Sequence, residues 1–145
     1  MITPDTAGKR LEVYAYCIMT SHLHLIIGTE SGNLSDIVRD FKSYTSRQMR
    51  LALEKSNTES RKEWMLWIFK RAGIQNERNI DFQFWKQDNH PIELDSLAKR
   101  TQRLSYLHNN PVEAGFVEKP EDWLHSSAAD YMGVRKGRIE LIYLE

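Results

Sequence analysis

The sequence of 145 residues has little cysteine and no long hydrophobic run. Its one cysteine, Cys17, excludes an internal disulfide framework and favours a reducing compartment. No apolar stretch approaches the roughly 18–20 residues of a membrane span, and the first ten residues lack the apolar segment of a secretory signal. We therefore expect a cytoplasmic protein.

Net charge is also absent, because 20 basic residues balance 20 acidic ones. A neutral sum argues against nucleic-acid binding, for which a basic balance is the usual mark. The charge is uneven, however: residues 35–71 hold nine Lys or Arg against five Asp or Glu, whereas residues 113–130 hold five acids and one lysine. Any DNA contact is therefore expected on one face of a single domain that spans residues 1–145.

Hydrophobic periodicity predicts both strands and helices. Residues 11–19 and 21–29 are expected to form a β-hairpin that turns at Thr20-Ser21. Apolar residues at helical spacing predict a long amphipathic helix over 34–55.

Later segments give weaker patterns. Ser56 and Glu59 suggest a capping box for a helix over 59–71 that ends at Gly73. The remaining expectations are a strand over 80–87, a helix over 96–109 stopped by Pro111, and a short strand over 139–144.

His22 and His24 are separated by one residue in the second predicted strand. Because alternate residues of a strand point to one face, the two imidazoles would lie side by side, as a divalent metal requires. Leu23 and Leu25 are expected to point the other way, toward a core. A bare His-x-His is a short motif, so two exposed polar residues on a half-buried strand are the alternative interpretation.

Tyr106 lies on the polar side of the predicted helix over 96–109. At 100° per residue it is about 160° from Leu104 and about 180° from Leu97, so it does not fill the core beneath that helix. It is either a hydroxyl presented to a site or a surface tyrosine. Asn110 shares this face if the helix persists, and its amide is either a third metal ligand or a C-cap.

Two further sets of side chains suit nucleic acid. A polar stripe with a flanking arginine runs along the helix predicted over 34–55 and consists of Arg39, Lys42, Ser46, Arg50 and Arg47. It could position phosphates, or it could be an ordinary solvated face. The four tryptophans, Trp64, Trp67, Trp85 and Trp123, offer stacking surfaces for unpaired bases. The spacing of Trp64 and Trp67 favours a core or interface role instead.

Five segments, in order, resemble one family. YAYCIMTSHLHLII resembles the His-hydrophobic-His segment of the single-tyrosine HUH transposases. Four later segments resemble the REP-associated tyrosine transposase branch of that family: LSDIVRDFKSYTSRQM, FQFWKQDNHPIEL, YLHNNPVEAGFVEKP and HSSAADY. The resemblance covers about residues 11–137 and implies an α+β fold with a ferredoxin-like antiparallel sheet and helices on one side.

The resemblance also implies an activity: binding of hairpin-bearing single-stranded DNA, which is nicked and rejoined through a 5′-phosphotyrosine intermediate. Tyr106 matches the family's nucleophile, and His22, His24 and Asn110 match its ligands for Mg²⁺ or Mn²⁺. From their charge, we expect the following residues to contact the DNA backbone: Arg39, Lys42, Arg47, Arg50, Lys99, Arg100 and Arg103.

Two features depart from the family pattern. Thr20-Ser21 stands where the family usually has Pro-Asn before the first histidine. About ten residues precede the first predicted strand, too few for the family's opening strand and helix, which we expect to be missing. The sheet edge beside the His-bearing strand would then be open, and we expect a monomer or a homodimer that covers this edge. The alternative to an active transposase is a catalytically inactive, degenerate DNA-binding remnant.

Overall fold

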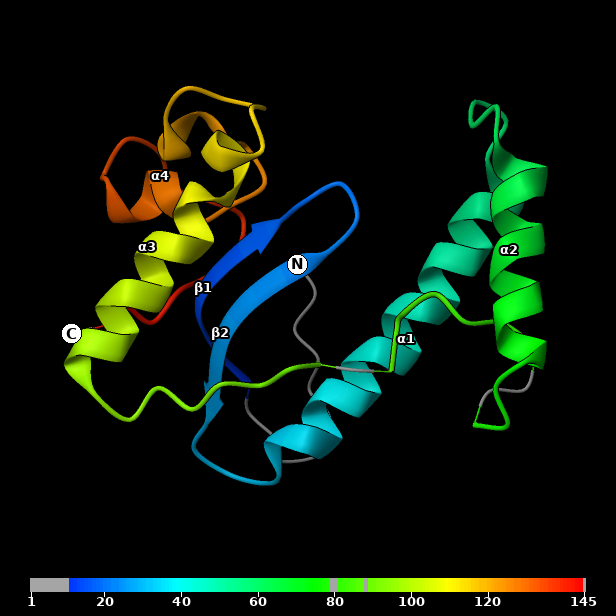
Figure 1. The fold of residues 1–145 in the computed structure, drawn as a ribbon, viewed down its shortest axis with the longest axis horizontal. Helices are drawn as coiled ribbons and strands as arrows, with labels where there is room; N and C mark the ends of the chain where they lie inside the picture. Colours follow the sequence, from blue (N-terminus) through cyan, green and yellow to red (C-terminus); the bar gives the residue numbers. More distant parts are fainter. Residues whose placement is uncertain (1–10, 79–80, 88, 145) are drawn as a thin grey trace. The chain divides into compact units, whose positions relative to one another are not determined.

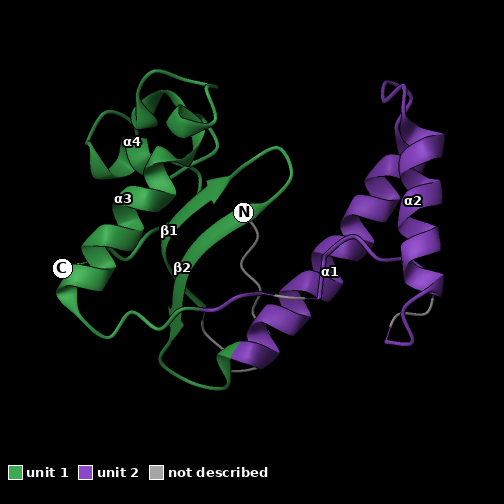
Figure 2. Ribbon diagram, in the orientation of Figure 1, with its two compact units in different colours: residues 1–34, 92–145 green, residues 35–91 purple. Residues whose placement is uncertain are grey.

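The computed structural model describes residues 11–78, 81–87 and 89–144 of the chain (Figure 1). The chain divides into two compact units, residues 35–91 and the remainder, which combines residues 1–34 with 92–145 (Figure 2). We call the segment 35–91 the helical unit and the remainder the hairpin unit. The single domain predicted over residues 1–145 stays a prediction.

The hairpin unit is built on two antiparallel strands, β1 (Leu11–Ile18) and β2 (Leu23–Thr29). The backbone amide of Met19 donates to the carbonyl of His22 at 2.9 Å and closes the tip. In the resulting register Cys17 lies opposite His24. The predicted hairpin is therefore confirmed.

The outer edge of β1 is bonded by the C-terminal part of the chain. The amide of Ile18 donates to the carbonyl of His125, and the amide of Ser127 donates to the carbonyl of Tyr16. Farther along, the amide of Ile142 donates to the carbonyl of Val13. The strand predicted over 139–144 is wrong, because this bond from Ile142 is not continued into the repeated ladder of bonds that a strand needs among the described residues.

Helix α3 (Leu97–Glu113) begins at a true N-cap, where the Ser96 side chain accepts from the amide of Lys99. The prediction that Pro111 stops this helix is wrong. Proline lacks only its own amide and its φ suits a helix, so near the end of the helix it removes a single hydrogen bond. The helix continues to Glu113. Beyond it, the φ of 76° at Gly115 allows the amides of Gly115 and Phe116 to bond back to the carbonyls of Val112 and Pro111, and the chain leaves the helix.

A small core lies between α3 and the hairpin. It contains Ala15, Cys17, Met19, Ile26 and Leu107. Because these strand residues share a face with His24, the expectation that Leu23 and Leu25 point toward the core is wrong, and Leu25 is exposed. Beyond α3, the chain forms a 3₁₀ turn, η1 (Pro120–Asp122), and a short helix, α4 (Ala128–Tyr131).

The helical unit consists of α1 (Leu34–Lys55), which is confirmed as predicted, and α2 (Lys62–Ile74). Helix α2 begins three residues later than expected, and only the Ser56 half of the capping box is made. The Ser56 hydroxyl accepts from the amide of Glu59, and the Glu59 carboxylate accepts from the amide of Arg61. Both groups therefore stabilise a turn ahead of the helix.

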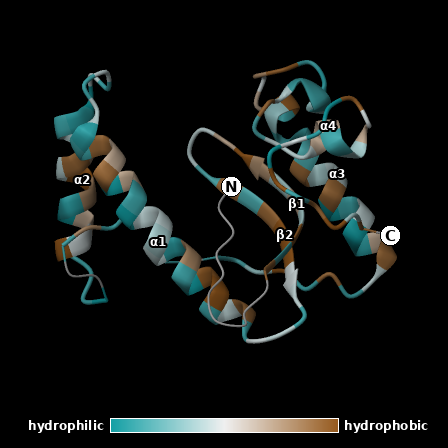
Figure 3. Cartoon of the chain, turned by 180° about the vertical axis from the view of Figure 1, so that it is seen from behind, coloured by the Kyte–Doolittle hydropathy of each residue, from teal (hydrophilic) through white to brown (hydrophobic). Residues whose placement is uncertain are grey.

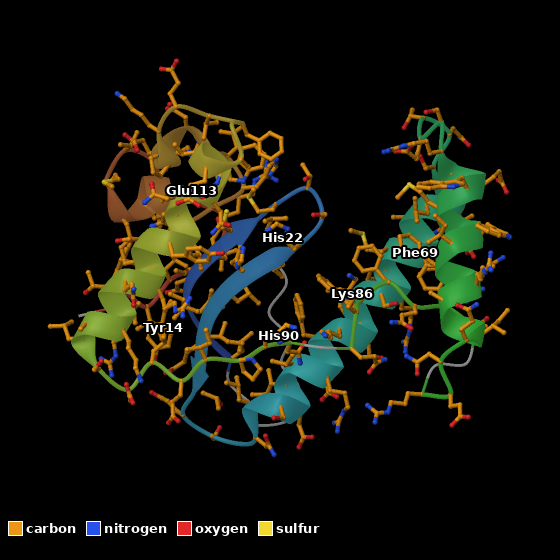
Figure 4. All side chains as sticks on the ribbon, viewed as in Figure 1. Tyr14, His22, Phe69, Lys86, His90 and Glu113 are labelled. Atoms are coloured by element: carbon orange, nitrogen blue, oxygen red, sulfur yellow. The ribbon has the colours of Figure 1, made fainter. Side chains whose placement is uncertain are left out.

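The segment after α2 packs by its aromatic side chains. The rings of Phe82 and Phe84 lie 5.4 and 5.3 Å from that of Phe69, which Figure 4 shows between α1 and α2. The strand predicted over 80–87 is wrong for the part that is described (Ile80 lies outside it). The amide of Gln83 donates to the carbonyl of Phe69, which lies within α2 and not in a neighbouring strand.

The described residues thus form an α+β fold with one two-stranded antiparallel sheet, consistent with the ferredoxin-like type. Hydrophobic stretches mark both strands and α2 in Figure 3. Within the described ranges, no helix is long and apolar enough to cross a membrane. The absence of the family's first strand and helix stays a prediction.

Candidate active site

Two histidines mark the start of β2, where Figure 4 shows His22 beside the hairpin tip. The rings of His22 and His24 lie side by side, perpendicular to each other, with 4.8 Å between their centroids. The Ser21 hydroxyl lies 3.1 Å from Nδ1 of His22, so Nε2 is the nitrogen of that ring that does not take part in this contact. The two imidazoles are therefore paired as the sequence predicts, although His22 lies one residue before β2 begins.

Helix α3 brings two more of the predicted residues to this pair. The ring of Tyr106 lies 5.7 Å from that of His24, edge to face. Asn110 lies one helical turn farther, and its side-chain amide donates to the carbonyl of Tyr106 at 2.7 Å. Because α3 continues through Pro111, both side chains share one face of the helix. All four residues predicted for the chemistry lie together within the hairpin unit.

The environment of His24 keeps its imidazole neutral. Burial is the main cause that lowers the pKa of His24, and the neighbouring His22 adds to this effect. The side chain of Asn110 acts in the opposite direction. A neutral imidazole is the form that binds a metal ion.

The donor atoms fit a divalent cation. The Nε2 atom of His24 is buried and has no hydrogen-bond partner among the described residues. A buried nitrogen without a partner is costly, and a bound cation would satisfy it. No group of three or more His, Cys, Asp and Glu side chains in the described ranges could hold a metal. The third protein ligand that the family resemblance implies is the amide of Asn110.

Tyr106 is accessible and lies beside a positive charge. Its side chain is 47 % exposed, so a nucleic acid can approach the hydroxyl. The guanidinium of Arg103 lies 6.0 Å from the centre of the Tyr106 ring. A cation at this distance would stabilise negative charge on the phenol oxygen or on a nearby phosphate.

Two of the arginines predicted to contact DNA are paired with acids on α1 or nearby. Arg39 pairs with Asp36 and Asp40, and Arg50 pairs with Glu54 and Asp81. Exposed ion pairs of this kind contribute about 0–1 kcal/mol, so a phosphate could replace the carboxylates. Their role in DNA binding stays a prediction.

The other predicted DNA contacts have mixed surroundings. Lys42 donates to the carbonyl of Lys86, Lys99 pairs with Asp95, and Arg100 donates to the carbonyl of Leu94. Arg47 is exposed. For these residues, too, contact with DNA stays a prediction.

Sequence reasoning missed the support beneath α3. His108, two residues after Tyr106, is only 6 % exposed, and its Nε2 lies 2.9 Å from the Ser127 hydroxyl. The same hydroxyl oxygen accepts from the amide of Tyr16 at 3.0 Å. This bridge ties α3 to β1, and no local pattern could have predicted it because Ser127 lies 111 residues from Tyr16.

The chain is similar to known proteins. The family model described as "Transposase IS200 like" matches residues 3–72, which include both site histidines. Over these residues, just under half of its length, the chain is similar to IS200-like transposases. More particularly, it is similar to a protein of Haemophilus influenzae that carries the name of a REP-associated tyrosine transposase, with 28 % identity over 118 residues.

That match covers 80 % of this chain and 58 % of the relative, so the chain spans somewhat more than half the length of the curated relative. No solved structure matches the chain significantly.

Proposed function

We propose that the chain binds hairpin-bearing single-stranded DNA and nicks and rejoins it through a covalent 5′-phosphotyrosine at Tyr106. The observation that carries this proposal is the position of the His24 ring, which contacts the rings of both His22 and Tyr106 and has a buried, unpartnered Nε2. An imidazole pair beside an exposed phenol is suited to phosphoryl transfer, which needs a held phosphate and a nucleophile within reach.

His22, His24 and Asn110 would hold a Mg²⁺ or Mn²⁺ ion. When bound, such an ion withdraws electron density from a phosphate oxygen and offsets the charge that develops at phosphorus. The neutral state of His24, which follows from its burial, supports this role.

Tyr106 would act as the nucleophile. Its phenol oxygen forms a bond to the scissile phosphorus, and the bond from phosphorus to the 3′ oxygen breaks. The phenol proton is lost, and the departing 3′ oxygen takes up a proton to become a free 3′-hydroxyl. Attack of a 3′-hydroxyl on the phosphotyrosine reverses these steps and rejoins the strand without another energy source, because one phosphoester bond replaces another.

The chain's remaining residues would position the nucleophile and the strand. The hydrogen bond from Asn110 to the backbone of Tyr106 couples the proposed third ligand to the nucleophile's own turn of helix. Arg103 would stabilise the phenolate as it forms. The predicted DNA-contacting residues on α1 and α3 would bind the phosphate backbone.

The experiment is a covalent-capture assay on a 3′-end-labelled oligonucleotide that carries a hairpin. In Mn²⁺ the wild-type chain should become labelled in a denaturing gel, and EDTA should prevent the labelling. Tyr106→Phe should abolish the adduct, whereas Tyr44→Phe, which alters an equally exposed tyrosine, should leave it unchanged. Equal adduct yields from wild type and Tyr106→Phe would refute the assignment of the nucleophile.

A further inference from the structure

Helix α2 carries two tryptophans on its exposed face. Trp64 and Trp67 are 57 % and 55 % exposed, and Ile74, about two turns beyond Trp67, is 75 % exposed. The opposite face is buried through Leu66 and Gly73. The core role that their spacing suggests is therefore wrong, and the interface role stays a prediction. Helix α2 thus has an apolar face that is exposed in the structure.

The two indoles lie close together along the helix. They are three residues apart, which gives a rise of about 4.5 Å and a rotation of about 60° between them. Indole rings at this spacing present two flat surfaces within one turn of helix. Flat aromatic surfaces on a single-stranded DNA-binding protein stack against unpaired bases, which all have a π-face.

Positive charge accompanies the indoles. The guanidinium of Arg71 lies 5.2 Å from the centre of the Trp67 ring, a cation–π arrangement that holds the charge over one face of the indole. Lys70 is exposed next to it. From Arg61 to Arg71 the chain has four basic residues and one acid, Glu63.

Two of these four cations have partners within the chain. Arg61 pairs with Glu59, and Lys62 donates to the carbonyls of Glu54 and Ser56. Lys70 and Arg71 are thus the cations that accompany the indoles. Their charge is complementary to a phosphate backbone, and this complementarity favours a DNA strand over a purely apolar protein partner.

We infer that the exposed face of α2, formed by Trp64, Trp67, Lys70 and Arg71, binds unpaired nucleotides of single-stranded DNA by stacking, with the two cations on the phosphates. This platform is separate from the chemistry at Tyr106. The inference depends on the proposed function only in that the substrate is single-stranded DNA.

The test measures the affinity of the full chain for a fluorescent oligo-dT that has no hairpin, by anisotropy and without divalent metal. Replacement of each indole by alanine should weaken binding about tenfold, since one stacked base contributes about 1–3 kcal/mol. Trp64→Phe and Trp67→Phe should stay within a few-fold of wild type because phenylalanine keeps an aromatic face. Arg71→Ala should make the affinity less dependent on salt concentration, with a slope about one unit smaller.

The matched control is Ile74→Ala, which removes an exposed apolar side chain from the same helix without removing an aromatic ring. It should bind oligo-dT as wild type does. Unchanged affinity in Trp64→Ala/Trp67→Ala, with a circular dichroism spectrum like that of wild type, would overturn the inference. Conversion of a dimer to a monomer by the same double substitution, without loss of oligo-dT affinity, would overturn it in favour of an interface between two copies of the chain.

These outcomes are independent of the proposed chemistry. Tyr106→Phe should bind oligo-dT normally even though it forms no adduct. If wild type forms no adduct but the indole variants lose oligo-dT affinity, the platform stands and the proposed function fails.

Discussion

Acidification should destabilise the hairpin unit through His108. This imidazole is buried between α3 and β1, and burial lowers its pKa to about 4 from an ordinary value of 6.5. In the unfolded chain it takes up a proton as the pH falls through 6.5, whereas in the folded chain it resists protonation until about pH 4. The unfolded state binds more protons throughout this window, so the free energy of unfolding decreases as the pH falls through it.

The size of the effect follows from the two values. Between about pH 7.5 and pH 5 the expected loss is about 2 kcal/mol, with about 1 kcal/mol more by pH 4 and little beyond. The lowered pKa of His24 changes stability in the same direction. A shift of this size is a large fraction of the stability of a small domain.

The assay is urea unfolding of wild type and His108→Gln over the same pH series. Glutamine can still hydrogen-bond to Ser127 but has no proton to gain. It should therefore reduce the pH dependence between pH 7.5 and pH 5 by about 2 kcal/mol, whatever its stability at neutral pH. Equal losses of stability in both proteins over this range would show that protonation of His108 does not cause the pH dependence.

Two substitutions in the helical unit test its packing. Gly73→Ala should destabilise the helical unit by about 1–3 kcal/mol, because a Cβ at this position would collide with the backbone of Asp81 and Phe82. Thermal melting measures this loss. A higher melting temperature would show that the gain in helix propensity, about 1 kcal/mol, prevails instead. Thr45→Val should cost about 1–3 kcal/mol, because it leaves the indole N–H of Trp85 without the hydroxyl to which it donates at 2.8 Å. Thr45→Ser keeps that hydroxyl and should stay near wild type in the same measurement, and equal losses from the two changes would count against the hydrogen bond.

Local patterns predicted the hairpin and α1 well. In each, the periodicity of apolar residues extends over a full element, and a turn separates it from the next. The juxtaposition of His22 and His24 follows from their spacing of two residues at the start of β2. Tyr106 and Asn110 share a face because they are four residues apart on a helix.

Errors arose where distant parts of the chain decide the structure. The alternation of Phe82 and Phe84 resembles a strand, yet both rings pack on Phe69 of α2, and no neighbouring strand pairs with their backbone within the described residues. Gly73 resembles a helix stop, yet it lies inside α2 where the backbone of Phe82 approaches closely. The helix continues through Pro111 because the proline is buried and Gly115 supplies the end. None of these contacts has a signature in the residues next to it.

The arrangement of the hairpin unit has a consequence for synthesis on the ribosome. The helical unit, residues 35–91, is complete before α3 has emerged, whereas the hairpin unit must wait for partners more than a hundred residues later, such as Ser127 for Tyr16 and Tyr131 for Tyr14. Contacts so distant in sequence form slowly. His22 and His24 therefore leave the ribosome long before Tyr106 can join them, and a nascent chain could bind DNA through α2 before it is able to cut it.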